Sequence, residues 1–272
     1  MQKHVKEPIL IIKTAWGGKS LHTDFRPPSA GPYVLNDFQR DLYTKKGTDL
    51  EKWNADKAKA TGVYYRLMMD HVKSVLKGIK RVYPEYDPKQ GYELAGFVWF
   101  QGWNDMVDGH TYPDRKNPGG YDMYSKLLAQ FIRDVRKDLS SPKMPFVIGV
   151  MGVGGVKNSP ESFQTAMAVP AALPEFKDNV TAVWTGKCWD PVLGELEARW
   201  GKVKGKRRAM QKAGLLSKQQ QQEALDKYIA ELYTPQELEL KNKGCSNAAY
   251  HYLGSAKIMA QIGKAFAEAL AE

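Results

Sequence analysis

The sequence predicts an α/β protein in which a parallel β-sheet lies between two layers of helices. Short β-branched runs alternate along the chain with longer segments whose apolar residues recur at helical spacing. Turns rich in glycine or polar residues follow several of these runs, as they do at the carboxyl ends of parallel strands. The chain has 272 residues, 43% of them hydrophobic, which is enough to bury one large core. We therefore expect a three-layer α/β/α sandwich over residues 1–272.

Four runs are predicted as strands, because each is short, rich in β-branched or aromatic residues and followed by a turn signal. They are Ile9–Ala15, Leu94–Phe100, Phe146–Val150 and Val180–Trp184. Strands that alternate with helices indicate a parallel sheet, because the connection between parallel strands is a crossover that a helix can supply.

Four longer segments are predicted as helices, mainly from apolar residues at helical spacing. They are Thr61–Tyr83, Tyr121–Leu139, Pro160–Leu173 and Ser255–Ala271. Ser159 is expected to cap the third helix, with Pro160 as its first residue. The stretch from Leu21 to Lys59 is rich in proline, glycine, aspartate and lysine, so we expect a long irregular loop that becomes partly helical near its end.

Much of the formal net charge of +10 lies between Lys202 and Lys218. A surplus of this size is typical of nucleic-acid-binding proteins. The segment has no interleaved aromatic residues and no base-reading motif, so we interpret it as a solvated basic part of a helical insertion at about residues 191–241. No nucleic-acid partner is therefore expected, and a nucleic-acid-associated protein is kept only as an alternative.

The chain shows no signature of a membrane span, a metal centre or a nucleotide site. The longest apolar runs, such as Pro145–Val153, are too short to cross a bilayer. The two cysteines, Cys188 and Cys245, form no CxxC pair, which argues against a zinc knuckle or a disulfide scaffold. A phosphate loop ending in the GKS of residues 18–20 would need a glycine where Lys13 stands. No signal peptide is visible, and neither compartment nor oligomeric state can be inferred.

Two short blocks carry the residues best suited to chemistry. VWFQGWND at Val98–Asp105 is an apolar run that ends in polar residues, so a strand would deliver the carboxamides of Gln101 and Asn104 to its tip. YHYLGSAK at Tyr250–Lys257 places His251 directly before a helix. Acyl transfer to serine uses a carboxamide or backbone N–H to stabilise the oxyanion and a histidine as base, and both are present here.

The turn after the first predicted strand is a further source of donors. Gly17 and Gly18 would expose backbone N–H groups there. His22 and His110 lie in loops near the expected site, and we expect them to contact substrate. Ser20 is the nearest candidate nucleophile in a segment that superficially matches a G-x-S-x-G elbow, but His22 stands where the second glycine belongs.

These blocks together resemble the SGNH (GDSL-type) hydrolases, and within them the sialate O-acetylesterase and acetylxylan-esterase branch, carbohydrate esterase family six. That branch carries W-x-Q-G-E-x-D where this chain has WFQGWND, and the wider superfamily carries G-x-N-D, matched by Gly102 to Asp105. The Gly-Gly turn of the family is similar to Trp16–Ser20. Its last block, D-x-x-H before a helix with a lysine, is matched at His251 and Lys257.

The resemblance implies a flavodoxin-like sheet of five parallel strands in the order 2-1-3-4-5, of which this chain would lack the first. It also implies hydrolysis of O-acetyl esters on a carbohydrate or sialic acid, with His251 as the base of a serine nucleophile. Gly17, Gly18, Gln101 and Asn104 would form the oxyanion hole. No metal or organic cofactor is implied.

The chain departs from the family pattern in two places. Ala248 stands where the aspartate of D-x-x-H belongs, and no serine precedes the first predicted strand, where the family has a G-D-S or G-Q-S-N block. We therefore expect an amino-terminally truncated esterase that is inactive alone. The alternative is a non-catalytic carbohydrate-binding or interaction protein on an esterase scaffold. By the resemblance, full-length relatives are expected to be secreted or periplasmic.

Overall fold

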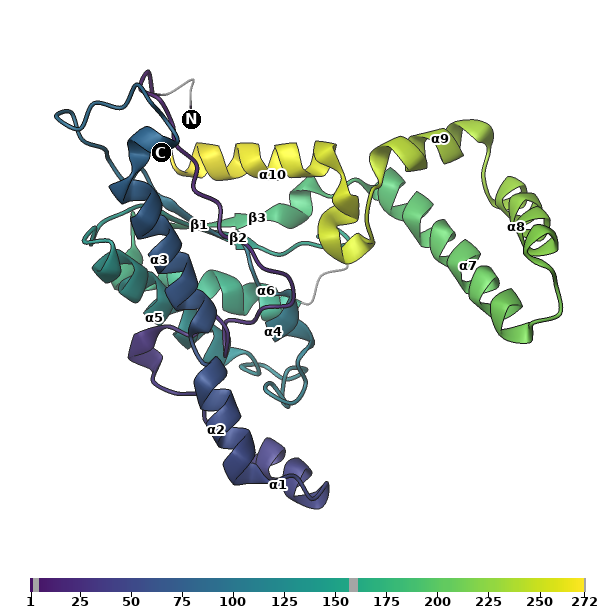
Figure 1. Cartoon of the computed structure of the whole chain (residues 1–272), viewed down its shortest axis with the longest axis horizontal. Helices are drawn as coiled ribbons and strands as arrows, with labels where there is room; N and C mark the ends of the chain where they lie inside the picture. The colour runs from purple at the N-terminus through teal and green to yellow at the C-terminus, as the bar shows by residue number, and fades with distance from the viewer. Residues whose placement is uncertain (2–4, 157–160, 272) are drawn as a thin grey trace. The chain divides into compact units, whose positions relative to one another are not determined.

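A computed structural model describes residues 1, 5–156 and 161–271 of the chain (Figure 1). The chain forms two compact units. Unit 1 comprises residues 1–151, 160–184 and 266–272, and unit 2 comprises residues 152–159 and 185–265. The cap predicted at Ser159 and Pro160 lies outside the described residues.

Unit 1 contains the sheet and the helices packed on it (Figure 1). Its strands and α-helices are α1 (Asp37–Lys45), α2 (Leu50–Ala60), α3 (Val63–Lys77), β1 (Phe97–Trp99), α4 (Trp103–Val107), α5 (Asp122–Asp138), β2 (Phe146–Val150), α6 (Glu161–Ala168) and β3 (Val180–Trp184). The predicted loop from Leu21 to Lys59 thus contains two helices. The first of them begins at a capping box in which Asn36 and Gln39 satisfy each other's backbone N–H groups.

The three strands form a parallel sheet in the order β1-β2-β3, which confirms the predicted fold class. Phe97 of β1 is in register with Phe146 of β2, which is in register with Val180 of β3. All five residues of β2 are buried, as expected for a central strand covered on both faces.

The prediction of a strand at Ile9–Ala15 is wrong. The segment pairs with no strand among the described residues, and the side chain of Ile11 is 83% exposed. A β-branched run becomes a strand only when it pairs with a neighbour, and in the described sheet the edge strand β1 pairs with β2 alone. The β1 strand is also shorter than the predicted Leu94–Phe100.

One face of the sheet packs against α5. Phe131 of α5 lies with its ring centroid 4.3 Å from that of Trp99 and 6.0 Å from that of Phe97, and it is fully buried. Tyr65 of α3 meets the same ring at 5.6 Å. Full burial of one such side chain contributes roughly 1.5–3 kcal/mol, so this aromatic cluster is a major part of the core.

The other face is covered by the end of α10 (Ala256–Ala269), a helix that begins in unit 2 and ends in unit 1. A Cβ atom at Gly149 of β2 would lie 2.5 Å from the Phe100 ring and 2.7 Å from the Phe266 ring. Glycine is therefore required for this close approach. The sheet thus lies between helices on both faces, as predicted.

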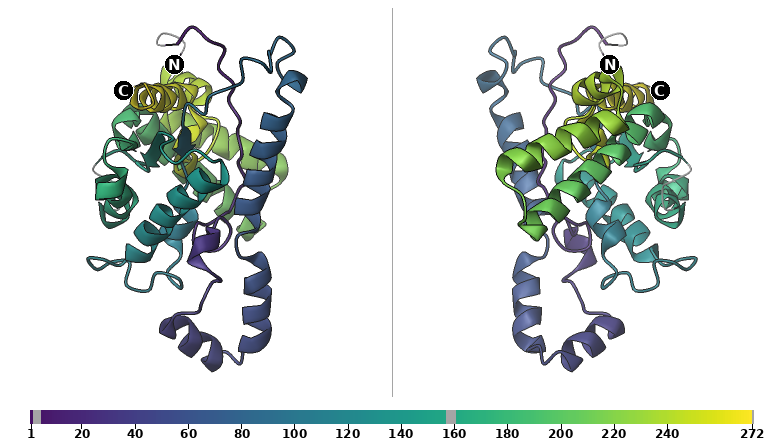
Figure 2. Two further views of the ribbon diagram at one scale, coloured as in Figure 1. Left: turned by 90° about the vertical axis from the view of Figure 1, so that its left-hand side faces the viewer. Right: turned by 90° about the vertical axis from the view of Figure 1, so that its right-hand side faces the viewer.

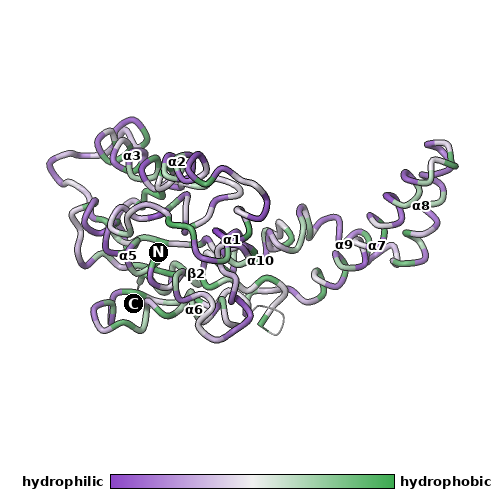
Figure 3. Tube along the Cα trace, turned by 90° about the horizontal axis from the view of Figure 1, so that it is seen from below, coloured by the Kyte–Doolittle hydropathy of each residue, from purple (hydrophilic) through white to green (hydrophobic). Residues whose placement is uncertain are grey.

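Unit 2 is mainly helical, and its segment at 191–244 folds as α7 (Pro191–Ala213), α8 (Lys218–Leu232) and α9 (Pro235–Gly244). Asp190 caps α7 by accepting hydrogen bonds from the N–H groups of Val192 and Leu193. Helices α7 and α8 run side by side as a hairpin (Figure 2), and hydrophilic stretches recur along both (Figure 3). Within the described residues, no helix is long and apolar enough to span a membrane.

Candidate active site

The Gly-Gly turn presents a row of backbone donors. Gly18 has φ +72°, a left-handed conformation that glycine adopts without strain. The N–H groups of Gly17, Gly18 and Lys19 donate to no acceptor among the residues that the structure describes. Three consecutive N–H groups are therefore available to an incoming anionic group.

The polar residues after β1 meet this turn, as predicted. The side-chain amides of Gln101 and Asn104 each donate to the carbonyl oxygen of Lys19 at 2.9 Å. Asn104 lies in the first turn of α4, which starts directly after Gly102. A Cβ atom at Gly102 would lie 2.9 Å from the Phe163 ring, so glycine is needed where the chain turns from strand to helix.

Gln101 and Asn104 differ in how many amide N–H groups remain free for a ligand. Both N–H groups of the Gln101 amide are used, one on Lys19 and one on Asp105 at 2.8 Å. Its oxygen Oε1 is buried and accepts no hydrogen bond from the described residues. Exchanging the amide oxygen and nitrogen would point Oε1 at two other oxygens, so the orientation is fixed. Asn104 uses only one N–H, and the other remains available to a ligand.

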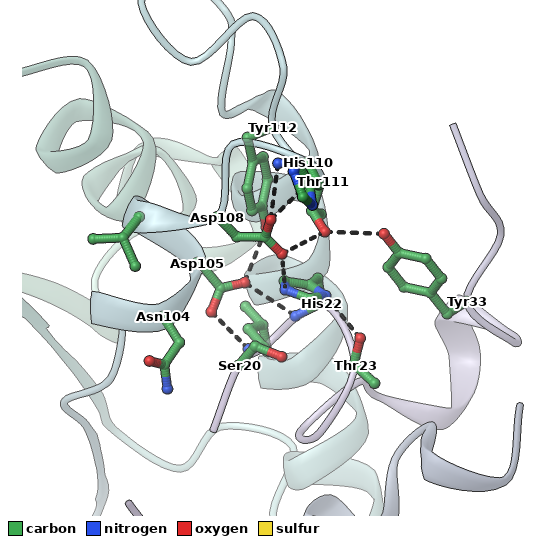
Figure 4. A network of polar contacts seen from close by, with 12 residues as sticks. Ser20, His22, Thr23, Tyr33, Asn104, Asp105, Asp108, His110, Thr111 and Tyr112 are labelled. Carbon is green, nitrogen blue, oxygen red and sulfur yellow. Dashed lines mark hydrogen bonds and ion pairs between the residues drawn. The ribbon is translucent and has the colours of Figure 1, made fainter. Parts of the chain in front are cut away.

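Asp105, which was given no role from the sequence, holds the turn in place. The side chain is completely buried and accepts hydrogen bonds from the backbone N–H groups of Leu21 (2.8 Å) and His22 (3.1 Å). It also accepts from the Tyr112 hydroxyl at 3.0 Å (Figure 4). A fourth donor is the Gln101 amide. A buried carboxylate is tolerated when its oxygens are satisfied in this way. The last letter of the G-x-N-D block was the signal that could have identified it.

Tyr112 is the buried hydroxyl donor to Asp105. Burial, and then the negative charge of Asp105, raise the pKa of the Tyr112 hydroxyl well above its ordinary value. The phenol therefore keeps its proton and donates to the carboxylate.

His22 is buried, with 4% of its surface exposed, and both ring nitrogens have partners. Nε2 lies 3.2 Å from Asp108, and Nδ1 lies 2.7 Å from the Thr23 hydroxyl. Burial alone would raise the pKa of Asp108, but hydrogen bonds from His22 and Thr111 outweigh it and hold that pKa well below its ordinary value. The observed contacts give His22 a structural role, and a direct contact with substrate stays a prediction.

His110 lies in the same loop as Asp108 and is exposed. Its backbone N–H donates to Asp108 at 2.9 Å, and its ring lies 6.2 Å from that of Phe38 and 6.3 Å from that of Tyr43. A ring that is open to solvent can still meet a sugar, so the predicted role of His110 is compatible with its position.

The described residues offer no activated nucleophile near the turn. Ser20 is buried and its hydroxyl donates to Asp24 at 3.0 Å. Thr23 contacts a histidine, but it is 4% exposed, so an ester carbonyl could not reach it. In unit 2, burial raises the pKa of the thiols of Cys188 and Cys245, which disfavours the reactive thiolate.

His251 lies in unit 2, on a short helical turn at Ala249–Gly254. The ring is exposed and stacks edge-on against Tyr250 at 4.4 Å. The next two residues, Tyr252 and Leu253, have φ of 50° and 62°, left-handed values that are strained for side chains of this size.

Hydrogen bonds hold this strained turn. The Tyr252 hydroxyl lies 2.7 Å from the hydroxyl of Thr185 and accepts the N–H of Gly152 at 2.8 Å. Where the family aspartate is missing, the carbonyl of Ala248 accepts the N–H groups of His251 and Leu253. The exposed imidazole is thus carried by a hydrogen-bonded backbone, and the Ala248 carbonyl contacts the main chain of His251.

The structure therefore gathers Gly17, Gly18, Gln101 and Asn104 into one arrangement in unit 1. His22 and His110 join it through Asp108, and His251 belongs to unit 2. Among the described residues, no group of three or more His, Cys, Asp or Glu could hold a metal ion.

The chain is a parallel α/β sandwich whose polar donors follow the end of a strand. Open α/β proteins keep their sites at this carboxyl edge of the sheet. Residues 1–186 match the family described as carbohydrate esterase, sialic acid-specific acetylesterase, and the chain belongs to that family. The matched span contains the Gly-Gly turn and the Gln101–Asp105 block, whereas His251 lies beyond it. Searches of curated proteins and of solved structures found no match.

Proposed function

We propose that this protein provides the oxyanion-binding part of a carbohydrate O-acetylesterase site. The donors would be the N–H groups of Gly17 and Gly18 together with the second N–H of Asn104. The observation that carries the proposal is the row of unsatisfied N–H groups beside an amide that retains one N–H. Loss of one such donor typically removes about 3–4 kcal/mol of transition-state stabilisation.

Gln101 has a different role in this proposal from the one predicted. Because both of its N–H groups are used, it positions the turn rather than binding the oxyanion. His22 likewise acts through its contact with Asp108, while His110 remains the proposed sugar contact.

His251 is the proposed general base, by its place in the sequence resemblance. It would take the proton of a serine as the hydroxyl attacks the acetyl carbonyl, and it would give that proton to the sugar oxygen as the ester bond breaks. It would then activate water to release acetate from the acetyl-serine. The rigid turn around Tyr252 and Leu253 supports this role, because strained backbone at a fixed position often marks a functional side chain. We assign no serine of the described residues as the nucleophile, so the proposed reaction needs a nucleophile from outside them.

The proposed substrates are acetylated carbohydrates, either O-acetylated sialic acid or acetylated xylan. A non-catalytic carbohydrate-binding protein on the same scaffold is the second candidate. The absence of an activated hydroxyl among the described residues and the replacement of the family aspartate by Ala248 favour this second candidate.

The two candidates are separated by extending the chain ahead of Met1 with a strand and a G-Q-S-N turn. Acetate release is then measured from O-acetylated sialic acid and from acetylated xylo-oligosaccharides, beside the unextended chain. The esterase proposal predicts activity only in the extended chain, and loss of that activity in His251→Ala. Binding of the sugar by a folded extended chain without any turnover would support the non-catalytic candidate instead.

A further inference from the structure

The distal half of α7 and the turn after it form a surface that the proposed site does not use. We call residues 202–218 the basic arm. The arm carries seven basic residues and no acidic one: Lys202, Lys204, Lys206, Arg207, Arg208, Lys212 and Lys218. It lies entirely within unit 2 and outside the span matched by the family.

Two of these charges have partners within the unit. Lys204 forms an ion pair of 2.8 Å with Glu197, and the ammonium group of Lys206 lies 4.0 Å above the ring of Tyr228. The other basic side chains of the arm are exposed, and within the described part of the chain they contact no carboxylate. They are Lys202, Arg207, Arg208, Lys212 and Lys218.

The spacing of the charges makes the arm repel itself. Lys204, Arg208 and Lys212 follow one another at intervals of four residues, so they lie on one side of the helix as like charges. Elsewhere in unit 2 the same interval carries opposite charges, as in the pairs Glu195–Arg199 and Glu239–Lys243. Glu197 compensates the charge of Lys204, but Arg208 and Lys212 have no carboxylate partner among the described residues. An external polyanion would remove the repulsion that remains between them.

We infer that the basic arm binds a linear acidic glycan through its carboxylate or sulfate groups. The charges alone would also suit nucleic acid, but residues 202–218 contain no aromatic side chain on which bases could stack. The nearby aromatic rings are already covered, since Trp200 lies beneath the ammonium group of Lys241 at 4.1 Å and Tyr228 beneath Lys206. The choice of a glycan rests on the proposed carbohydrate function, whereas the binding of a polyanion does not.

The test measures binding, so its outcome does not depend on ester turnover. A fluorescent heparin oligosaccharide is titrated with the 272-residue chain over a series of salt concentrations, beside a short DNA duplex and neutral xylan. The variant removes four unpaired charges together: Lys202→Gln, Arg207→Gln, Arg208→Gln and Lys212→Gln. The matched control removes four exposed lysines of α1, its carboxyl cap and α2: Lys45→Gln, Lys46→Gln, Lys52→Gln and Lys59→Gln.

The chain is expected to bind heparin at about 0.1 M salt, where charges on a protein surface are partly screened. The arm variant should bind at least about tenfold more weakly. The slope of log K against log salt should be smaller by roughly three to four, if heparin releases counterions as DNA does. The control should change much less, and circular dichroism should show equal helix content in all three proteins.

Several results would overturn the inference. Failure of the wild-type chain to bind heparin would contradict it. Equal losses of heparin affinity in the arm variant and the control would also contradict it, because they would show that only net charge matters. Tighter binding of the DNA duplex than of heparin at every salt concentration would replace the glycan with a nucleic acid. If the arm binds heparin while the extended chain never releases acetate, the esterase proposal fails and the polyanion site stands.

Discussion

Unit 1 and unit 2 each present proposed functional groups from a loop, but they fix the loop by different means. In unit 1 a buried carboxylate, Asp105, gathers two backbone N–H groups, an amide and a phenol beneath the Gly-Gly turn. In unit 2 a buried phenol, Tyr252, holds a turn whose backbone is strained. Loss of Asp105 would leave four donors unsatisfied, whereas loss of the Tyr252 hydroxyl would affect its contacts with Gly152 and Thr185. The two loops should therefore differ in their sensitivity to mutation.

The largest effect is expected from Asp105→Ala. The change leaves the N–H groups of Leu21 and His22 and the Tyr112 hydroxyl without their acceptor in a buried place, at about 1–3 kcal/mol for each unsatisfied group. We expect a loss of roughly 3–5 kcal/mol in the free energy of unfolding, measured by urea denaturation. Asp114→Ala, at an exposed carboxylate, is the control and should change little. A loss below about 1 kcal/mol for Asp105→Ala would show that the carboxylate does not hold the turn.

Tyr252→Phe should have a smaller effect on the same measurement. The variant keeps the ring but removes the oxygen that accepts the N–H of Gly152 and meets Thr185, so we expect a loss of roughly 1–3 kcal/mol. Tyr92→Phe, at an exposed ring, is the matched control. If the two variants lose equal stability, the Tyr252 hydroxyl is not the anchor of this turn, and the contrast between the units disappears.

The Gly-Gly turn provides a comparison between two neighbouring glycines. A Cβ atom at either position would meet nothing within 4 Å, but only Gly18 has a positive φ. Gly18→Ala should therefore cost about 1 kcal/mol through backbone strain, whereas Gly17→Ala should be close to neutral. Thermal unfolding of the two variants measures the difference. Equal melting temperatures would mean that the turn does not hold Gly18 in the left-handed conformation.

The smallest effect concerns the pH dependence of stability. The pKa of Asp108 is lowered in the folded chain, so its contribution is present above its unfolded pKa of about 3.9 and is lost as the pH falls below that value. Asp108→Asn should therefore have a lower free energy of unfolding than wild type at neutral pH. Below about pH 3.9 the difference should shrink, by at most about 1.4 kcal/mol per pH unit, which is the slope for one bound proton. A deficit that stays constant from neutral pH to about pH 2 would contradict the assignment.

The fold class could be predicted because it depends on local patterns. The strand at Phe146–Val150 is buried on both faces, and its continuous apolar run indicated that directly. The run at Ile9–Ala15 has a similar composition but forms no strand, because pairing is decided by a neighbour that is distant in sequence. Composition alone cannot supply that information.

The candidate site could be predicted in part for the same reason. Gln101 and Asn104 were expected at the tip of a strand, and their side-chain amides contact the Lys19 carbonyl of the Gly-Gly turn. The sequence could not show that the Lys19 carbonyl and Asp105 use both N–H groups of Gln101, because that depends on distances across the turn. It also could not show that Asp108 and Thr23 contact the two ring nitrogens of His22.

The most direct test of the account is the effect of Asn104→Ala on acetyl ester turnover by the extended chain that carries a G-Q-S-N turn. The control is Asn117→Ala, at an exposed amide of unit 1 that is outside the proposed donor set. The account predicts that Asn104→Ala lowers kcat by about 10²–10³-fold with little change in KM, because the donor acts in the transition state. Unchanged kcat in a folded Asn104→Ala variant would contradict the assignment of this turn and amide as the oxyanion site.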